Sequence, residues 1–234
     1  MATFIVAHGA WSAGWAWKKM RPLMRAAGHE LWTPTYTGLG ERAHLANPDV
    51  SLDTHIQDIV AVLEIEDLKD VYLIGHSYGG MVATGVGDRA RDRIKHIIYV
   101  DAYAPKSGQS AFDMQNPDIA AQRREATKAN GDGWRMAIGP MPPDTAPEDA
   151  AWAVPRRKPQ PIKTFEMKLK LSAEPTAPRT YIYAKRARPD DGFRPSLERA
   201  KREGWRTYEI DASHNPHITA PDVLMKILNE TAAA

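Results

Sequence analysis

A serine lies between two glycines in the run Gly75–Gly79 (GHSYG), which matches the pattern G-x-S-x-G. An apolar run precedes this motif and small residues follow it, so the serine is expected on a sharp turn between a strand and a helix. Such a turn raises the hydroxyl at the carboxyl edge of a sheet and points the positive end of the helix at it. We therefore predict that Ser77 is a nucleophile, and a purely structural turn is the alternative interpretation.

A base must take the proton of this serine, because a serine hydroxyl is a weak nucleophile by itself. Histidine suits this role because its pKa lies near neutral pH. Two histidines follow the last predicted strand, in the run Ser213–His217 (SHNPH). His214 is nearer to the end of that strand, so we predict that it is the base. His217 is then expected on the pocket wall or the surface.

The carboxylate that orients the base has two possible positions in the chain. The usual position follows the predicted strand 180–184, but the first carboxylates there are Asp190 and Asp191, several residues on and past a proline. Asp101 directly follows the predicted strand 94–100, so it could reach the same histidine from the neighbouring strand end. We favour Asp101, with Asp190 or Asp191 as the alternative. A cap of the following turn is the other interpretation of Asp101.

Acyl transfer also needs two hydrogen-bond donors for the developing oxyanion. The backbone N–H of Tyr78, directly after the serine, is one candidate. The N–H of Ala10, in the loop after the first predicted strand, is the other. Gly9 is expected to allow the tight turn that aims the Ala10 N–H. His8, at the end of that strand, is expected to hold the loop and to take no part in proton transfer.

Short apolar runs alternate with helical patterns in the first half of the chain and again near its end. Continuous apolar strands with helices between them predict an α/β fold, in which helices cover both faces of a mostly parallel sheet. The predicted strands are Thr3–Ala7, Glu30–Thr35, Val71–Ile74, Ile94–Val100, Thr180–Ala184 and Arg206–Ile210. The predicted helices of this part are Trp17–Gly28, Thr54–Leu68, Gly79–Arg89, Arg194–Gly204 and Pro221–Asn229.

The alternation of strands and helices stops after Asp101, and the next stretch is rich in proline, methionine, tryptophan and charge without a strand pattern. We predict that residues 107–178 form an inserted helical cap. Residues 1–106 and 179–234 then form the core. The predicted helices of the cap are Ile119–Asn130, Pro147–Val154 and Ile162–Leu171.

Aromatic side chains are expected to shape the substrate pocket. Trp134 and Trp152 of the predicted cap are expected to form part of its roof, and Trp11 part of its floor. A place in the interior of the cap is the alternative for each cap tryptophan. A small or medium apolar ester fits such a pocket best.

Composition excludes several other functions. The 234 residues include 31 basic and 29 acidic side chains, so no overall basic field attracts nucleic acid or an anionic membrane. The chain has no cysteine, which excludes a thiol nucleophile, Cys-ligated zinc and iron–sulfur clusters. We expect no metal and no cofactor. No apolar stretch approaches the roughly 20 residues that span a bilayer, and no targeting signal is visible, so a cytoplasmic protein is expected. The oligomeric state stays open between a monomer and a homodimer.

These residues together resemble those of the α/β-hydrolases. More narrowly, the chain resembles the compact subfamily of plant methyl-ester hydrolases, hydroxynitrile lyases and related bacterial esterases. The resemblance covers nearly the whole chain. Its markers are Phe4–Trp17 (FIVAHGAWSAGWAW), Gly38–His44 (GLGERAH), Leu73–Gly80 (LIGHSYGG), Val100–Pro105 (VDAYAP) and His214–Pro221 (HNPHITAP).

The resemblance implies a Ser–His–acid mechanism with Ser77 and His214, and backbone donors at Ala10 and Tyr78. The leading hypothesis is therefore a serine hydrolase that cleaves a carboxylic ester through an acyl-enzyme. A non-catalytic protein that uses the pocket to bind a small ligand is the alternative. Hydroxynitrile lyases of the group carry a threonine where this chain has Gly9 and a lysine where it has Asn215, so lyase chemistry is disfavoured.

Overall fold

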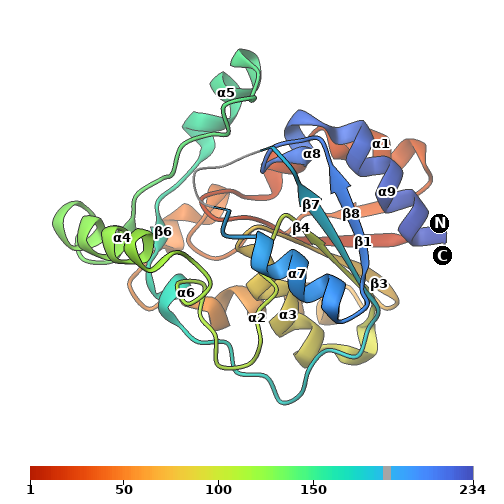
Figure 1. The fold of residues 1–234 in the computed structure, drawn as a ribbon, viewed down its shortest axis with the longest axis horizontal. Coiled ribbons are helices and arrows are strands. Elements are labelled where there is room, and N and C mark those ends of the chain that lie inside the picture. The colour runs from red at the N-terminus through yellow and green to blue at the C-terminus, as the bar shows by residue number, and fades with distance from the viewer. Residues whose placement is uncertain (187–190, 234) are drawn as a thin grey trace.

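The computed structural model describes residues 1–186 and 191–233. Within them, six parallel strands form a central sheet (Figure 1). These strands are β1 (Thr3–Ala7), β2 (Glu30–Trp32), β3 (Val71–His76), β4 (Ile94–Val100), β7 (Arg179–Ala184) and β8 (Arg206–Ile210). Their order across the sheet is β2-β1-β3-β4-β7-β8, which confirms the predicted α/β class with its mostly parallel sheet.

Helices cover both faces of this sheet (Figure 1). One face packs against α1 (Met20–Ala26) and α9 (Pro221–Ala233), and the short α8 (Pro216–Thr219) lies beside α9. The other face packs against α2 (Leu52–Ile65), α3 (Gly79–Arg89) and α7 (Arg194–Arg202). The buried apolar side chains accordingly form two clusters, one on each side of the sheet.

The alternation of side chains along each strand divides the core between these clusters. In β1, Ile5 and Ala7 face the cluster with α2 and α3, whereas Phe4 and Val6 face the cluster with α1 and α9. All four are fully buried. Burial on both faces explains why this strand is a continuous apolar run in the sequence.

Local chemistry shifts some predicted boundaries. Helix α2 begins two residues before the predicted Thr54, because the Ser51 hydroxyl accepts from the N–H of Thr54 and the Thr54 hydroxyl accepts from the N–H of Ser51. Strand β2 ends at Trp32, before the predicted Thr35, because Pro34 has no N–H to donate to a sheet ladder.

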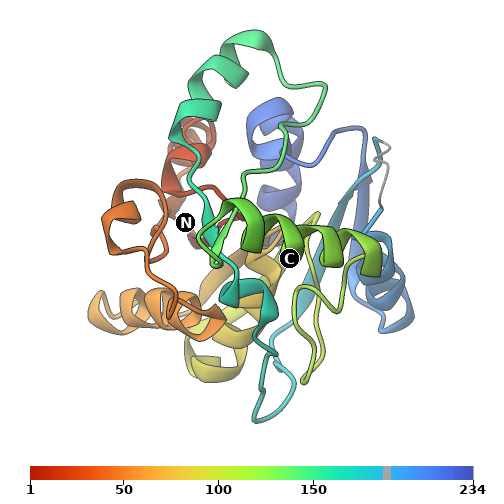
Figure 2. The same ribbon diagram turned by 90° about the vertical axis from the view of Figure 1, so that its left-hand side faces the viewer.

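Most of the segment between β4 and β7 lies beyond the carboxyl ends of the strands, and its last residues return beside the end of α3 to the start of β7 (Figures 1 and 2). Its elements are α4 (Pro117–Asn130), α5 (Pro147–Ala153), α6 (Lys163–Glu166) and a two-stranded antiparallel pair of β5 (Arg135–Met136) with β6 (Gln160–Pro161). The sequence did not predict this pair, because two-residue strands are too short to show an alternating pattern.

Helix α6 is much shorter than the predicted helix Ile162–Leu171. The chain turns extended at Met167 and then runs beside residues 107–109, where the Leu169 N–H donates to the Gln109 carbonyl at 2.9 Å. Tertiary hydrogen bonds therefore replace the last turns of the predicted helix.

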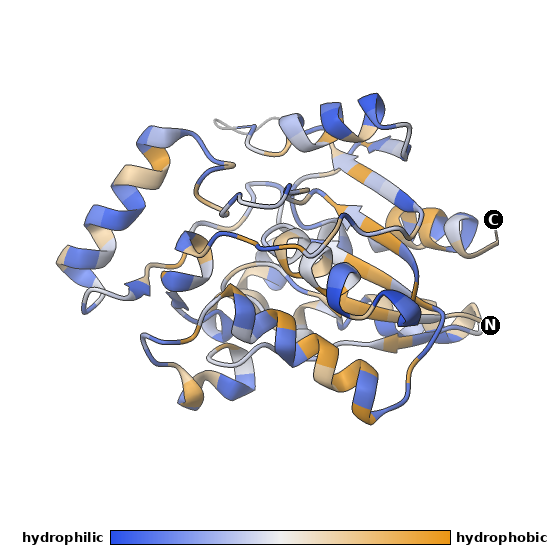
Figure 3. Ribbon diagram, turned by 90° about the horizontal axis from the view of Figure 1, so that it is seen from below, coloured by the Kyte–Doolittle hydropathy of each residue, from blue (hydrophilic) through white to orange (hydrophobic). Residues whose placement is uncertain are grey.

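Helix α4 is largely hydrophilic, whereas the sheet is largely hydrophobic (Figure 3). Among the described residues, every helix is too short or too polar to cross a membrane. The cytoplasmic location stays a prediction.

Candidate active site

Ser77 lies on the turn between β3 and α3, in the left-handed backbone conformation that the motif predicts, with a φ of 56°. The turn can be this tight because α3 starts against β1. A Cβ on Gly79 would lie 2.0 Å from the carbonyl oxygen of Ala7, so only glycine fits there. The Ser77 N–H donates to the Val100 carbonyl at 3.3 Å, which fixes the turn to the next strand.

His214 reaches this serine from the loop between β8 and α8. Its Nε2 lies 2.9 Å from the Ser77 Oγ, although 137 positions separate the two residues. The ring of Phe193 stacks on the imidazole, with centroids 4.9 Å apart. The His76 ring holds the backbone of the loop, because its Nε2–H donates to the His214 carbonyl at 2.8 Å.

Asp101 stands on the other side of the imidazole. Its Oδ2 lies 2.7 Å from the Nδ1 of His214, and its side chain is fully buried. The Asp101 N–H donates to the Ile182 carbonyl of β7 at 2.7 Å, and the Ala184 N–H donates to Oδ1 at 3.3 Å. A carboxylate accepts only, so Nδ1 carries the proton and a neutral ring leaves Nε2 free to accept from the serine.

Of the two alternative carboxylates, the structure describes only that of Asp191. Asp190 lies outside the described residues. Asp191 points to the Tyr183 hydroxyl, at 2.5 Å, and to the Arg194 guanidinium, at 2.8 Å. The structure therefore brings Asp101 to the imidazole and gives Asp191 other contacts. The strand order explains this, because β4 lies between β3 and β7 and brings its carboxyl end next to the serine turn.

Two backbone N–H groups stand near the serine. Neither the Ala10 N–H nor the Tyr78 N–H donates to a backbone carbonyl of the described residues. The loop that carries Ala10 approaches closely: a Cβ on Gly9 would lie 2.8 Å from the His76 Nδ1 and 3.2 Å from the Ser77 Cβ. Glycine is thus needed at position 9 for this close approach.

His8 also holds the loop that carries Gly9 and Ala10. Its Nδ1–H donates to the Gly9 carbonyl at 2.9 Å, and its Nε2 accepts from the Tyr36 N–H at 3.2 Å. Burial lowers the pKa of His8 to about 3, so the ring stays neutral and keeps both bonds at neutral pH. His217, the other histidine of the last loop, stacks on Trp17 with centroids 4.7 Å apart. Burial lowers its pKa well below the ordinary value.

A cavity of about 340 Å³ opens at Ser77 and His214. This size suits a small or medium ligand. Its walls are mostly apolar and include Trp11, Trp15, Met141, Phe165 and Phe193.

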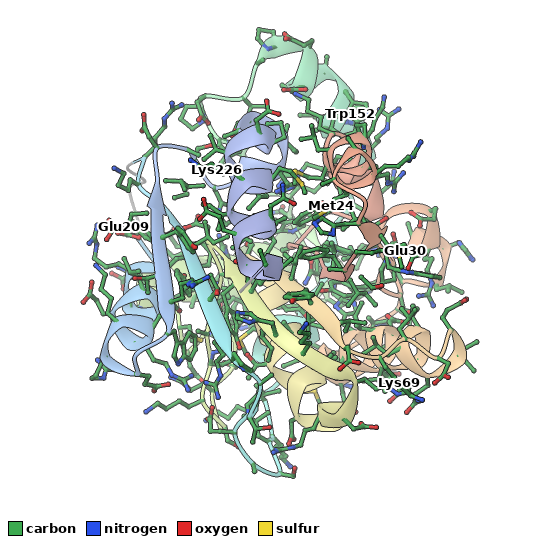
Figure 4. All side chains as sticks on the ribbon, turned by 90° about the vertical axis from the view of Figure 1, so that its right-hand side faces the viewer. Met24, Glu30, Lys69, Trp152, Glu209 and Lys226 are labelled. Atoms are coloured by element: carbon green, nitrogen blue, oxygen red, sulfur yellow. The ribbon has the colours of Figure 1, made fainter. Side chains whose placement is uncertain are left out.

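Trp11 lines this cavity as expected, but Trp134 and Trp152 do not. The guanidinium of Arg135 covers the Trp134 ring at 3.9 Å. Trp152, near the end of α5, packs edge-on against Trp15 with centroids 5.1 Å apart. Figure 4 shows Trp152 where α5 approaches the N-terminal part of the chain. Trp152 therefore contacts Trp15, a residue of the cavity wall, without lining the cavity itself. Sequence spacing could not separate these two positions, because the irregular segment between β4 and β7 has no period that marks an inner face.

Sequence reasoning also missed His76, which positions the backbone of His214. The available signal was its place inside the G-x-S-x-G motif, directly before the serine. Its contact partner lies 138 positions away, so the sequence by itself gave no reason to connect the two.

Known proteins resemble this chain over nearly its whole length. It is 36% identical over 244 residues to a carbendazim hydrolyzing esterase of Nocardioides sp. (strain SG-4G), covering 97% of this chain and 98% of that one. It is 24% identical to methylesterase 17 of Arabidopsis thaliana, covering 99% of this chain and 91% of the relative.

Solved structures agree with these relatives. An extracellular alpha/beta-hydrolase from a Paenibacillus species superposes with a TM-score of 0.85 at 27% identity, over 98% of both chains. The Arabidopsis methylesterase MES16 superposes with a TM-score of 0.75 at 22% identity, over 100% of this chain and 99% of that one, and this likeness shows the fold alone. The sequence model of the alpha/beta hydrolase family matches residues 4–227 of this chain. The chain therefore belongs to the alpha/beta hydrolase family.

Proposed function

We propose that this protein is a carboxylic ester hydrolase in which Ser77 is the nucleophile, His214 the general base and Asp101 the residue that orients the base. The observation that carries this proposal is the continuous line of contacts from Ser77 Oγ through both nitrogens of His214 to Asp101, at 2.9 and 2.7 Å. The similarity to a carbendazim hydrolyzing esterase and to a methylesterase supports ester cleavage by this site.

In the first half of the reaction, Ser77 Oγ attacks the ester carbonyl carbon while its proton passes to Nε2 of His214. The new C–O bond gives a tetrahedral oxyanion, to which the N–H groups of Ala10 and Tyr78 donate. Breaking the bond to the alcohol oxygen restores the carbonyl, and the imidazolium returns the proton to the leaving alcohol. The fully buried carboxylate of Asp101 stabilises the imidazolium between these proton transfers.

In the second half, a water molecule replaces the alcohol. His214 takes one proton from this water, and the hydroxide oxygen adds to the acyl carbon. The bond to Ser77 Oγ then breaks, and the imidazolium returns the proton to Oγ. The products are a carboxylic acid and the free enzyme. No cofactor takes part in this sequence.

The substrate is a small or medium ester with an apolar body. The cavity volume of about 340 Å³ and its aromatic walls support this choice. Residues 107–178 act as the cap, since Met141 and Phe165 of this segment line the cavity that opens at Ser77. The lyase alternative gains no support, because Asn215 has no charge to stabilise a leaving cyanide.

Labelling with a fluorophosphonate probe tests this proposal. The wild type should bind one probe covalently on Ser77, as located by peptide mass spectrometry, and should hydrolyse p-nitrophenyl acetate. Ser77→Ala should lose both properties and keep the circular dichroism spectrum and the melting temperature of a folded protein. Its kcat should fall by about 10⁴–10⁶-fold, the range seen when a serine nucleophile is removed.

Two results would contradict the proposal. A Ser77→Ala variant with full esterase activity would place the chemistry on another residue. A folded wild type that neither reacts with the probe nor cleaves any ester would favour the ligand-binding alternative.

A further inference from the structure

Two arginines stand beside the same tryptophan in the wall of the cavity. The guanidinium carbon of Arg123, from α4, lies 5.6 Å from the centre of the Trp11 ring. That of Arg157, which follows α5, lies 5.7 Å from it. All three residues line the cavity that opens at Ser77. The pocket thus combines a flat indole surface with two positive charges.

Both guanidiniums have neutral partners. Arg157 donates to the Gly139 carbonyl at 2.5 Å, and Arg123 donates to the Gln115 side-chain oxygen at 2.7 Å. In residues 1–186 and 191–233, neither is within 4 Å of a carboxylate, unlike the neighbouring Arg124, which is 3.7 Å from Glu166. Burial lowers the pKa of the Arg157 guanidinium from its ordinary value.

The third arginine of the cavity wall is different. Arg186 forms an ion pair with Asp144 at 2.7 Å and another with Asp211 at 3.3 Å. Asp144 lines the cavity as well, and its carboxylate is paired with Arg186, which it shares with Asp211. The positive charges of Arg123 and Arg157 are therefore the ones that the described side chains leave uncompensated.

A further unmet donor lies next to them. The Nε2 of Gln115 is buried and has no hydrogen-bond partner among the described residues, although Gln115 lines the cavity. The oxygen of the same amide accepts from Arg123, so the NH₂ group is the part left unpaired. A buried donor without a partner is costly, and so is a charge in a half-buried site that no opposite charge compensates. An anion with several acceptor oxygens removes both costs.

We propose that the preferred substrates are esters that also carry a carboxylate, held by Arg157 and Arg123 while the apolar body lies against Trp11. Planar guanidiniums bind carboxylates through paired hydrogen bonds, and the amide of Gln115 supplies a further donor. The inference rests on the proposed ester hydrolysis at Ser77 and names its substrate class.

The carboxylate can belong to the acyl part or to the alcohol part of the ester, and two pairs of substrates separate these cases. The acyl pair is monomethyl terephthalate and its neutral analogue methyl 4-carbamoylbenzoate. The alcohol pair is 4-carboxyphenyl acetate and its neutral analogue 4-carbamoylphenyl acetate. Each pair keeps the shape and changes the charge. In at least one pair, the wild type should show a kcat/KM for the anionic ester about tenfold or more above that for the neutral one, the effect of one charge-assisted hydrogen bond.

The Arg157→Gln variant should lose this preference for the charged ester. Its kcat/KM for the anionic ester should fall about tenfold, through KM, and by a clearly larger factor than its kcat/KM for the neutral ester. Arg157→Lys should recover part of the preference. The matched control is Arg156→Gln, which removes the same charge from the adjacent exposed residue, whose guanidinium donates to the Trp152 carbonyl outside the cavity. This control should leave the preference unchanged.

A second measurement needs no variant. Raising the ionic strength should lower the kcat/KM of the wild type for the anionic ester more than for the neutral one, because salt screens the attraction. Equal or faster cleavage of the neutral ester in both pairs, without a difference in salt dependence, would overturn the inference and leave ester hydrolysis intact. Failure of the wild type to cleave any of the four esters or to react with the phosphonate probe would overturn ester hydrolysis and this inference together.

Discussion

The Nε2 of His76 lies 2.8 Å from the carbonyl oxygen of His214, so the residue directly before the serine holds the backbone of the residue that contacts the serine. A carbonyl accepts only, so Nε2 carries a proton in this bond. Burial lowers the pKa of His76 to about 3, and the nearby His214 also lowers it, so the ring is neutral at assay pH. His76 is therefore a positioning residue, with its donor directed at the loop.

Replacing His76 tests this positioning role. His76→Leu removes the donor, so the loop that carries His214 should shift and kcat should fall about 10²-fold, the effect of roughly 1 Å of misplacement. His76→Gln can still donate to the carbonyl and should recover much of kcat. KM should change little in either variant, and circular dichroism should show that both are folded. Equal kcat values for the leucine variant and the wild type would argue against the role.

The choice of carboxylate gives a second prediction. Asp101→Asn should lower kcat by about 10⁴-fold, because an amide favours the wrong tautomer of the imidazole. Asp191→Asn is the matched control, because Asp191 contacts Tyr183 and Arg194. It should leave kcat near that of the wild type. The measurement is the steady-state kcat of both variants on one aryl ester. A larger loss in Asp191→Asn than in Asp101→Asn would assign the orienting carboxylate to the loop after β7.

Buried histidines predict a loss of stability in mild acid. Burial lowers the pKa values of His8, His55 and His76 from 6.5 to about 3. The unfolded chain therefore binds protons between pH 6.5 and about 3 that the folded protein excludes. The free energy of unfolding should have its full value above pH 6.5. It should fall as the pH drops through that window, by up to about 1.4 kcal/mol per pH unit for each histidine.

Urea unfolding between pH 7 and pH 5 measures this effect above the range in which carboxylates titrate. His55→Gln removes one such group, whose Nε2–H donates to the Thr37 carbonyl at 3.1 Å, and should reduce the slope of unfolding free energy against pH. His44→Gln removes an exposed imidazole and serves as the control. A wild type whose unfolding free energy is constant from pH 7 to pH 5 would contradict the prediction.

Much of the core could be predicted from the sequence. The bounds of β1 and β4 agree with the prediction to the residue, because short, largely apolar runs are typical of buried strands. The bounds of β8 also agree, although this strand lies at the edge of the sheet and is largely exposed or half-buried. Helix α3 likewise agrees, from Gly79 to Arg89. The region between β4 and β7 agreed less well. Its short β5 and β6 and the early end of α6 depend on hydrogen bonds to distant residues, which no local pattern contains.

The residue types and chain order of the site were visible in the sequence, because a serine between glycines after a strand and a histidine after the last strand are local patterns. Only the tertiary structure decided which carboxylate meets His214, because that depends on β4 lying between β3 and β7 in the sheet. The same holds for His76 at the loop of His214 and for two arginines at Trp11. These contacts join residues far apart in the chain, and their distances are set by how the whole core packs.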